Sequence, residues 1–200
     1  MILNRTFKFL AFAMTLGLYS CGENNTPSEP LDIAEIDIHQ SVVTQEYSQV
    51  KKGSVLHWSA SHLGGLEPRI GKIYCKSARV ISSDGELTTA DISMDMSNMS
   101  VDNLEEESAL ELVSHLQSND FFDVPNYPIS TFELARIEPI SGDFNSKITG
   151  NLSILGVRKS ISFKANIEVT PEQVSVHSEE FTIDRDDWGM TYNAEGTAGV

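Results

Sequence analysis

The 200-residue chain is poor in cysteine and in basic residues. It has two cysteines, Cys21 and Cys75, and 14 Lys and Arg against 29 Asp and Glu. Two cysteines are too few for a disulfide framework, and the stability of the fold must therefore come from packing. The formal net charge of -15 argues against nucleic acid and anionic surfaces as partners. The sequence also lacks a Gly-x-Ser-x-Gly elbow, a phosphate loop, a dinucleotide fingerprint and a Cys/His nucleophile pattern, so it offers no familiar catalytic motif.

Long apolar runs are missing except near the N-terminus. Residues 1–20 contain Arg5 and Lys8, no acidic residue, and then an apolar run over residues 9–18. This is the arrangement of a secretory signal, and the run is too short for a lasting membrane span. The segment ends Leu18-Tyr19-Ser20-Cys21, which resembles a bacterial lipoprotein box with the cysteine as lipid acceptor.

We therefore expect residues 1–20 to be a lipoprotein signal peptide and Cys21 to be the lipidation site. Acyl chains on Cys21 would anchor the protein to a membrane of the cell envelope, facing the periplasm or the cell surface. A plain signal peptide followed by a free cysteine is the alternative. Residues 21–45 are polar and contain Pro27 and Pro30, which predicts a flexible tether. Residues 46–200 are then one domain with one core.

Strand periodicity dominates this domain. Apolar and polar residues alternate strictly from Ala90 to Met96, which predicts a strand with one buried face. The alternation changes parity at Leu155-Gly156, so residues 148–154 and 157–169 form a predicted hairpin. Turns are expected at Asp84-Gly85, Ser141-Gly142-Asp143 and Pro171-Glu172. Further strands are predicted at residues 54–62, 70–80, 131–137, 174–178 and 181–184. Many strands with short turns indicate an antiparallel barrel or sandwich.

One segment breaks the strand pattern. Between residues 104 and 117, Ala109, Leu112, Val113 and Leu116 share one helical stripe, and acidic residues 105–107 stand at the start, where the helix dipole favours negative charge. The stretch Asn119–Pro128 follows, with the pair Phe121-Phe122 and two prolines. Proline removes a backbone donor and restricts the residue before it, so this stretch is predicted to be a shaped, extended connector.

The connector, with Phe132 after it, resembles the "DFFDV..YP...F" pattern of the YceI-like family. Residues 62–64, 150–157 and 183–185 also resemble motifs of that family, and the similarity covers most of residues 54–190. The resemblance implies an all-β, antiparallel lipocalin-like β-barrel with one inserted helix. It also implies a non-catalytic protein without a cofactor, which sequesters or carries a polyisoprenoid or similar amphiphilic lipid.

The apolar parity of the strands must face inward, because an outward arrangement would expose a large apolar surface. With the resemblance, this parity predicts an interior lipid-binding pocket, and methionines in it would adapt to an irregular ligand. The alternative is that the same residues simply form a packed core. The predicted ligand-binding residues are Ile92, Met94, Met96, Phe121, Phe122, Phe132, Leu134, Leu152, Ile154, Phe163 and Trp188.

No metal site is expected. His57 and His62 have opposite parity on a predicted strand, so they would point to opposite faces. The acidic stretch at Asp184–Asp187 lacks the spacing of a calcium loop, and ion pairs that orient Arg185 are the expected role for it.

Two other functions stay open: a lipoprotein that recognises another envelope protein through its outer surface, and a hydrolase. At the C-terminus the chain stops where the family pattern would continue to a closing strand. Either the chain is C-terminally truncated or its barrel closes differently, and truncation is the expectation because unpaired sheet edges are usually avoided. The sequence leaves the identity of the lipid and the oligomeric state open.

Overall fold

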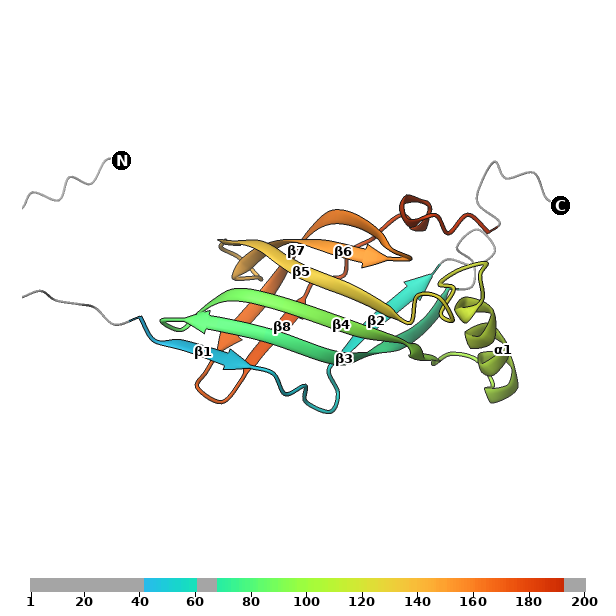
Figure 1. The fold of residues 1–200 in the computed structure, drawn as a ribbon, viewed down its shortest axis with the longest axis horizontal. Helices are drawn as coiled ribbons and strands as arrows, with labels where there is room; N and C mark the ends of the chain where they lie inside the picture. Colours follow the sequence, from blue (N-terminus) through green and yellow to red (C-terminus); the bar gives the residue numbers. More distant parts are fainter. Residues whose placement is uncertain (1–41, 61–67, 193–200) are drawn as a thin grey trace, which may run out of the picture. The chain divides into compact units, whose positions relative to one another are not determined.

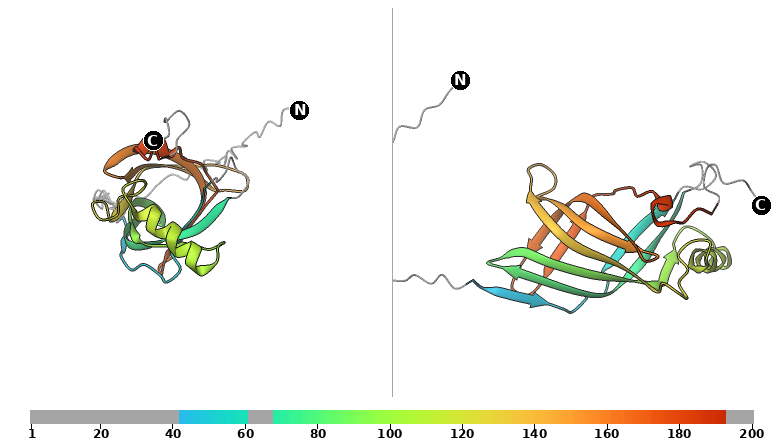
Figure 2. Two further views of the ribbon diagram at one scale, coloured as in Figure 1. Left: turned by 90° about the vertical axis from the view of Figure 1, so that its right-hand side faces the viewer. Right: turned by 45° about the horizontal axis from the view of Figure 1, so that its top comes forward.

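The strands form one antiparallel sheet that curls into a nearly closed barrel, seen from the side in Figure 1 and down its length in Figure 2. The computed structural model describes residues 42–60 and 68–192. Within these residues the sheet has eight strands. The elements are β1 (Thr44–Tyr47), β2 (Val55–Ala60), β3 (Arg69–Ser83), β4 (Glu86–Val101), α1 (Glu106–Gln117), β5 (Ile129–Pro139), β6 (Ser146–Ile154), β7 (Val157–Val169), β8 (Val174–Ser178) and the short 3-10 helix η2 (Arg185–Trp188).

Consecutive strands pair from β3 to β8, and β3 is long enough to serve two partners on its other side. Its first part pairs with β2, with Gly71 opposite Trp58, and its last part pairs with β1, with Val80 opposite Tyr47. One border of the sheet is therefore formed by β1 and β2 together. The other border is β8, whose ladder partner in the described part of the chain is β7.

Side chains close the seam between these two borders near the β7–β8 turn. The Tyr47 hydroxyl donates to the Thr170 carbonyl at 2.7 Å, and the Gln45 amide donates to the Pro171 carbonyl. The Lys51 ammonium donates to the Gln173 amide oxygen. The barrel is thus held shut at one end of the seam by side-chain hydrogen bonds in place of a strand ladder.

The predicted hairpin turns at Asp84-Gly85 and Leu155-Gly156 are confirmed. Both residues of each turn have positive φ, 51° and 80° at the first and 52° and 73° at the second. These are the angles that a two-residue turn needs to match the twist of its strands. Leu155 accepts a conformation that is uncommon for a side chain of its kind, because the long β6–β7 ladder on either side fixes the turn.

Two features of the sheet differ from the prediction. β1 was not expected, because Thr44–Tyr47 is short and polar, and it begins at the end of the predicted tether. The strand predicted at residues 181–184 is wrong: these residues lie outside any strand. The chain leaves the ladder after Ser178. There the Glu179 backbone N–H donates to the Lys164 carbonyl, and the Glu179 carboxylate accepts from the Lys164 backbone N–H.

The predicted helix is confirmed as α1, and it crosses one end of the barrel (Figure 2). Glu106 and Glu107 stand in its first turn and His115 in its last, as the helix dipole favours. Val113 and Leu116 pack against the barrel. In residues 42–60 and 68–192, no helix is long and apolar enough to span a membrane.

Candidate functional site

Two clusters of apolar side chains fill the end of the barrel beneath α1. The first contains Ile73, Met96, Met99 and Val124, and the second contains Ile154, Trp188 and Met190. Phe122 packs against both clusters. We call the two clusters together with Phe122 the end plug. The connector after α1 therefore contributes a side chain that joins the two halves of this packing.

The middle of the barrel is packed much less tightly than the end plug. Among the described residues no large side chain is completely buried, although a close-packed core of a domain this size would contain several. The strand register puts six predicted ligand-binding residues on the inner face, all of them only half-buried. They are Ile92, Met94, Phe132, Leu134, Leu152 and Phe163. Partial exposure of these inward side chains means that packing does not seal them.

Three phenylalanines line this interior. The rings of Phe132 and Phe163 lie 5.7 Å apart, and those of Phe163 and Phe181 stack at 4.7 Å with 7° between their planes. The Phe132 ring lies over Gly150, where a Cβ atom would come within 2.2 Å of the Phe132 Cζ. Because glycine has no side chain, position 150 leaves room for the Phe132 ring.

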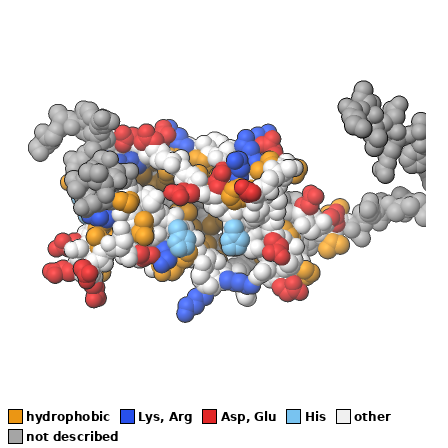
Figure 3. All heavy atoms as spheres, turned by 180° about the vertical axis from the view of Figure 1, so that it is seen from behind, with side chains coloured by type: hydrophobic (Ala, Val, Ile, Leu, Met, Phe, Trp, Pro, Cys, Tyr) orange, Lys and Arg blue, Asp and Glu red, His pale blue; other side chains and the backbone are white. Residues whose placement is uncertain are grey.

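The seam exposes inward-facing apolar side chains. Leu56 of β2 pairs with buried Ile73, and Val176 of β8 pairs with Ile167, so both have inward parity. Each is nevertheless 44% exposed. In Figure 3 hydrophobic side chains show between polar ones across the middle of the molecule, and acidic side chains are scattered over that face. Apolar side chains of inward parity are thus exposed at both borders of the seam.

Few polar groups face the interior. Cys75, opposite Met94, is a free thiol, and burial raises its pKa. Lys159 has inward parity at the start of β7, but its ammonium lies 3.3 Å from the Asp187 carboxylate of η2. Ser82, Ser130 and Ser146 are buried. Such a surface suits an apolar ligand with at most a small polar group.

Phe121 lies apart from the interior, in an aromatic group outside the end plug. Its ring makes an edge contact with His115 at 5.0 Å and a tilted contact with Tyr192 at 5.4 Å. The Arg185 guanidinium lies 5.5 Å from the Phe121 ring and donates to the Tyr192 carbonyl. Ion pairs with neighbouring aspartates were expected to orient Arg185; these two contacts hold it instead.

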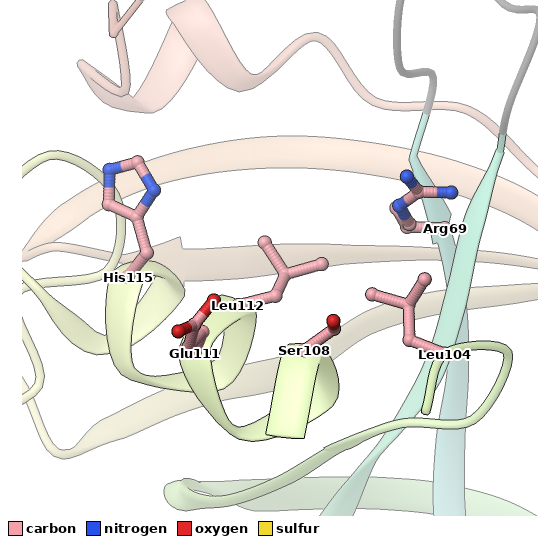
Figure 4. A pocket seen from close by; sticks show the side chains of 6 residues that line it. All are labelled: Arg69, Leu104, Ser108, Glu111, Leu112 and His115. Atoms are coloured by element: carbon pink, nitrogen blue, oxygen red, sulfur yellow. The ribbon is translucent and has the colours of Figure 1, made fainter. Parts of the chain in front are cut away.

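A groove of about 290 Å³ runs beside α1 (Figure 4). Four of its residues come from one side of the helix, while Arg69 stands at the start of β3. Leu104 and Leu112 give it an apolar part, and Glu111 and His115 a polar one. A second groove, of about 490 Å³, lies between the end of α1 and Pro125 and Pro128 of the connector. Neither groove is lined by the six interior residues.

The eleven predicted residues thus fall into three places. Six have inward parity, although Met94 and Leu152 among them also pack against the end plug; Met96, Ile154, Trp188 and Phe122 belong to the end plug itself. Phe121 lies outside both. The prediction missed Phe181 and Ser130 in the interior. Alternation of Phe181 with Ile183 could have pointed to Phe181, whereas no sequence pattern distinguishes Ser130 from a surface serine. The predicted lipidation site, Cys21, lies outside the described residues.

Similar proteins have been found by sequence and by structure. A "UPF0312 protein" of Pseudomonas putida is 31% identical over 128 residues, 60% of each chain. One of Pseudomonas aeruginosa is 42% identical over 53 residues, which cover 26% of this chain. The chain thus spans only 27% to 60% of the length of these curated relatives.

Among solved structures, the YceI protein of Campylobacter jejuni is 20% identical, with a TM-score of 0.35 over 74% of this chain and 69% of that one. A mutant "CJ YCEI protein" with a monobromobimane guest is also 20% identical, with a TM-score of 0.42 over 84% of each chain. Residues 43–200 match the YceI-like domain as a family. The nearly closed antiparallel barrel with one helix agrees with that match and with a lipocalin-like binding protein, and the chain belongs to the YceI-like domain family.

Proposed function

We propose that the barrel binds a polyisoprenoid or similar amphiphilic lipid in its interior and sequesters or carries it in the bacterial cell envelope. The observation that supports this most is the partial exposure of inward-facing apolar side chains at mid-barrel, next to a tightly packed end plug. Space that apolar side chains leave unfilled inside a barrel is suited to an apolar ligand.

Burial of the lipid chain supplies the free energy of binding. Apolar surface removed from water contributes about 25 cal/mol per Å², so several hundred Å² suffice after the cost of association. The rings of Phe132, Phe163 and Phe181 offer flat apolar surface, and Met94 adds a side chain that adapts to an irregular chain. No covalent step is needed for this function.

The chemistry of the interior favours binding over catalysis. A cysteine reacts as a thiolate, and burial raises the pKa of Cys75, so this thiol stays protonated at neutral pH. The seam, where Leu56 and Val176 are exposed, is the proposed route by which a lipid enters and leaves. In this proposal Cys21 is acylated, which would keep the domain close to a membrane that supplies or receives the lipid.

The identity of the bound molecule tests the proposal. We would purify the full chain natively from a bacterial host, extract it with organic solvent and analyse the extract by mass spectrometry. A stoichiometric isoprenoid lipid is the expected result. Protein that is empty, and that also fails to take up added isoprenoid quinones, would overturn the proposal.

A matched pair of variants separates interior binding from surface adsorption. Leu134 faces the interior on β5, and its neighbour Ala135 is exposed. Leu134→Glu places a charge among apolar side chains and should abolish retention of the lipid, whereas Ala135→Glu should leave it unchanged. Equal retention by both folded variants would mean that the lipid binds elsewhere.

A further inference from the structure

We propose that the Ser130 hydroxyl is the polar anchor of the barrel interior, and that it selects a neutral lipid carrying a hydrogen-bonding oxygen over an anionic one. This inference rests on the proposed function, since it names the class of lipid that the same interior takes. An isoprenoid alcohol or the carbonyl of a neutral isoprenoid would fit.

Ser130 differs from the other buried serines in having an unpaired hydroxyl. Ser82, Ser130 and Ser146 are 3%, 6% and 8% exposed. The Ser146 hydroxyl donates to the Asn145 side-chain oxygen at 2.9 Å, and the Ser82 hydroxyl lies 3.5 Å from the Tyr47 hydroxyl. The Ser130 hydroxyl makes no hydrogen bond within residues 42–60 and 68–192.

The position of Ser130 directs this hydroxyl to the interior. Ser130 pairs with Met94 in the β4–β5 ladder and has the same parity as Phe132, whose ring lies over Gly150. Across the next ladder, Met94 pairs with Cys75. Ser130 therefore stands on the inner face where the interior meets the end plug, among side chains that carry no charge.

The unpaired oxygen also opens into space. Among the described residues, no side-chain nitrogen or oxygen that is sealed from solvent lacks a hydrogen-bond partner. Because the Ser130 oxygen has no partner, it cannot be sealed. A largely buried serine whose oxygen still meets free space is in the position of a group that a ligand would contact.

A ligand oxygen satisfies this hydroxyl better than an apolar chain does. Because the Ser130 oxygen is accessible, water can hydrogen-bond it while the barrel is empty, and a ligand oxygen can replace that hydrogen bond whereas an apolar chain cannot. A serine hydroxyl can donate to a carbonyl or accept from an alcohol. A lipid with one such oxygen therefore gains an interaction that the corresponding hydrocarbon lacks.

The charge of the inner face argues against an anionic head group. On the described strands the cationic residues with inward parity are Arg69 and Lys159. Lys159 is paired with Asp187. Arg69 lies six residues along β3 from Cys75, the residue in register with Met94 and Ser130, which is roughly 20 Å at the rise of an extended strand. A phosphate near Ser130 would be buried without a counter-charge, which is strongly unfavourable.

Three lipids of one carbon skeleton test the inference on the full chain: an isoprenoid alcohol, its monophosphate and the hydrocarbon without oxygen. Affinities are measured by competition with a fluorescent isoprenoid for the wild type, Ser130→Ala and Ser146→Ala. Loss of one net hydrogen bond should weaken the binding of the alcohol to Ser130→Ala about fivefold. The affinity of Ser130→Ala for the hydrocarbon should be unchanged, and so should the affinity of Ser146→Ala for the alcohol. Ser130→Thr, which keeps the hydroxyl, should restore the preference for the alcohol, and the monophosphate should bind the wild type more weakly than the alcohol.

The outcomes separate this inference from the proposed function. Wild-type protein that binds none of the three lipids would contradict the proposed function itself. Wild-type protein that binds them, with the alcohol equally tight on Ser130→Ala or the phosphate tighter than the alcohol, would overturn the role of Ser130 alone. Thermal unfolding adds a second readout: Ser130→Ala should keep the Tm, because its hydroxyl makes no hydrogen bond within the described residues, while Ser146→Ala should lower the Tm by removing the hydrogen bond to Asn145. A lower Tm for Ser130→Ala would reveal a structural partner and contradict the inference.

Discussion

Phe163 and Phe181 stack face to face, with ring centroids 4.7 Å apart and planes within 7°. Phe163 belongs to β7, whereas Phe181 follows β8 in a stretch without strand pairing. The extended chain after β8 therefore supplies the third ring of the interior, which the barrel strands alone would not provide.

Replacing Phe181 with alanine should destabilise the barrel. The change removes an aromatic pair and half-buried apolar surface, together worth about 2 kcal/mol. Urea unfolding of the full chain measures the difference, with Thr182→Ala at the exposed neighbouring position as the control. If both variants unfold at the same urea concentration, the stacking contributes nothing to stability.

The two adjacent phenylalanines of the connector should respond differently to truncation. Phe122 packs against both clusters of the end plug, while Phe121 contacts His115 and Tyr192 on the outside. We expect Phe122→Ala to lower the free energy of unfolding by about 3 kcal/mol and Phe121→Ala by about 1 kcal/mol. Chemical denaturation of both variants checks this order. A larger loss of unfolding free energy for Phe121→Ala would show that Phe121, and not Phe122, belongs to the end plug.

Two glycines in the sheet should differ in how an added methyl group acts. A Cβ at Gly71 would lie 1.8 Å from the backbone oxygen of Ser100, whereas a Cβ at Gly150 would first meet the Phe132 ring. At Gly71 the severe contact is with backbone that can move only by breaking the β3–β4 ladder. At Gly150 the closest contact is with a ring that can shift into the interior, and the Glu133 backbone oxygen at 2.7 Å requires a smaller adjustment. Gly150→Ala should therefore cost about 1–3 kcal/mol and weaken lipid binding, and Gly71→Ala should cost more. Equal costs, or unchanged lipid binding in Gly150→Ala, would count against this view.

The ion pair between Lys72 and Asp102 predicts a pH dependence of stability. Their side chains lie 2.6 Å apart; the hydrogen bond to Asp102 raises the pKa of Lys72, and the same bond lowers the pKa of Asp102. The carboxylate contributes stability above its unfolded pKa of about 3.9, which is lost as the pH falls through the lower folded pKa. The ammonium contributes fully below its unfolded pKa of about 10.4, and this is lost as the pH rises through the higher folded pKa.

Lys72→Met should accordingly lower the Tm at pH 7 in low salt, because it removes the partner of Asp102. The difference from the wild type should shrink when Asp102 is protonated, and also in high salt, since both groups are exposed and salt screens them. Calorimetry at neutral and acidic pH measures this. A Tm difference that persists after Asp102 is protonated would point to lost packing of the lysine stem instead.

Much of the fold could be predicted because strict alternation fixes which residues share a face. Residues 90–96 and the hairpin around Leu155-Gly156 follow this rule, and α1 was recognisable from its apolar stripe. β1 could not be predicted, since Thr44–Tyr47 has no apolar alternation and pairs only because β3 is long enough to receive it. The unpaired state of residues 181–184 depends on where β8 ends, which Glu179 and Lys164 decide through a contact distant in sequence.

The candidate site shows the same division. Parity correctly put Phe132, Leu152 and Phe163 on one face, but it carries no information on depth along the barrel. Met96, Ile154 and Trp188 are apolar, as pocket residues are. They nevertheless lie in the end plug, because α1 and η2 cover that end of the barrel. Ser130 was overlooked because serine is usually exposed, and only its burial and missing partner reveal it.

The most direct measurement is photo-cross-linking of a diazirine-labelled isoprenoid alcohol to the full chain, with adducts mapped by peptide mass spectrometry. A lipid held inside the barrel should label peptides that contain Ile92, Met94 and Phe132, and an excess of unlabelled alcohol should suppress this labelling. Adducts confined to the groove beside α1 or to the outer face, or labelling that the competitor does not reduce, would contradict binding in the interior.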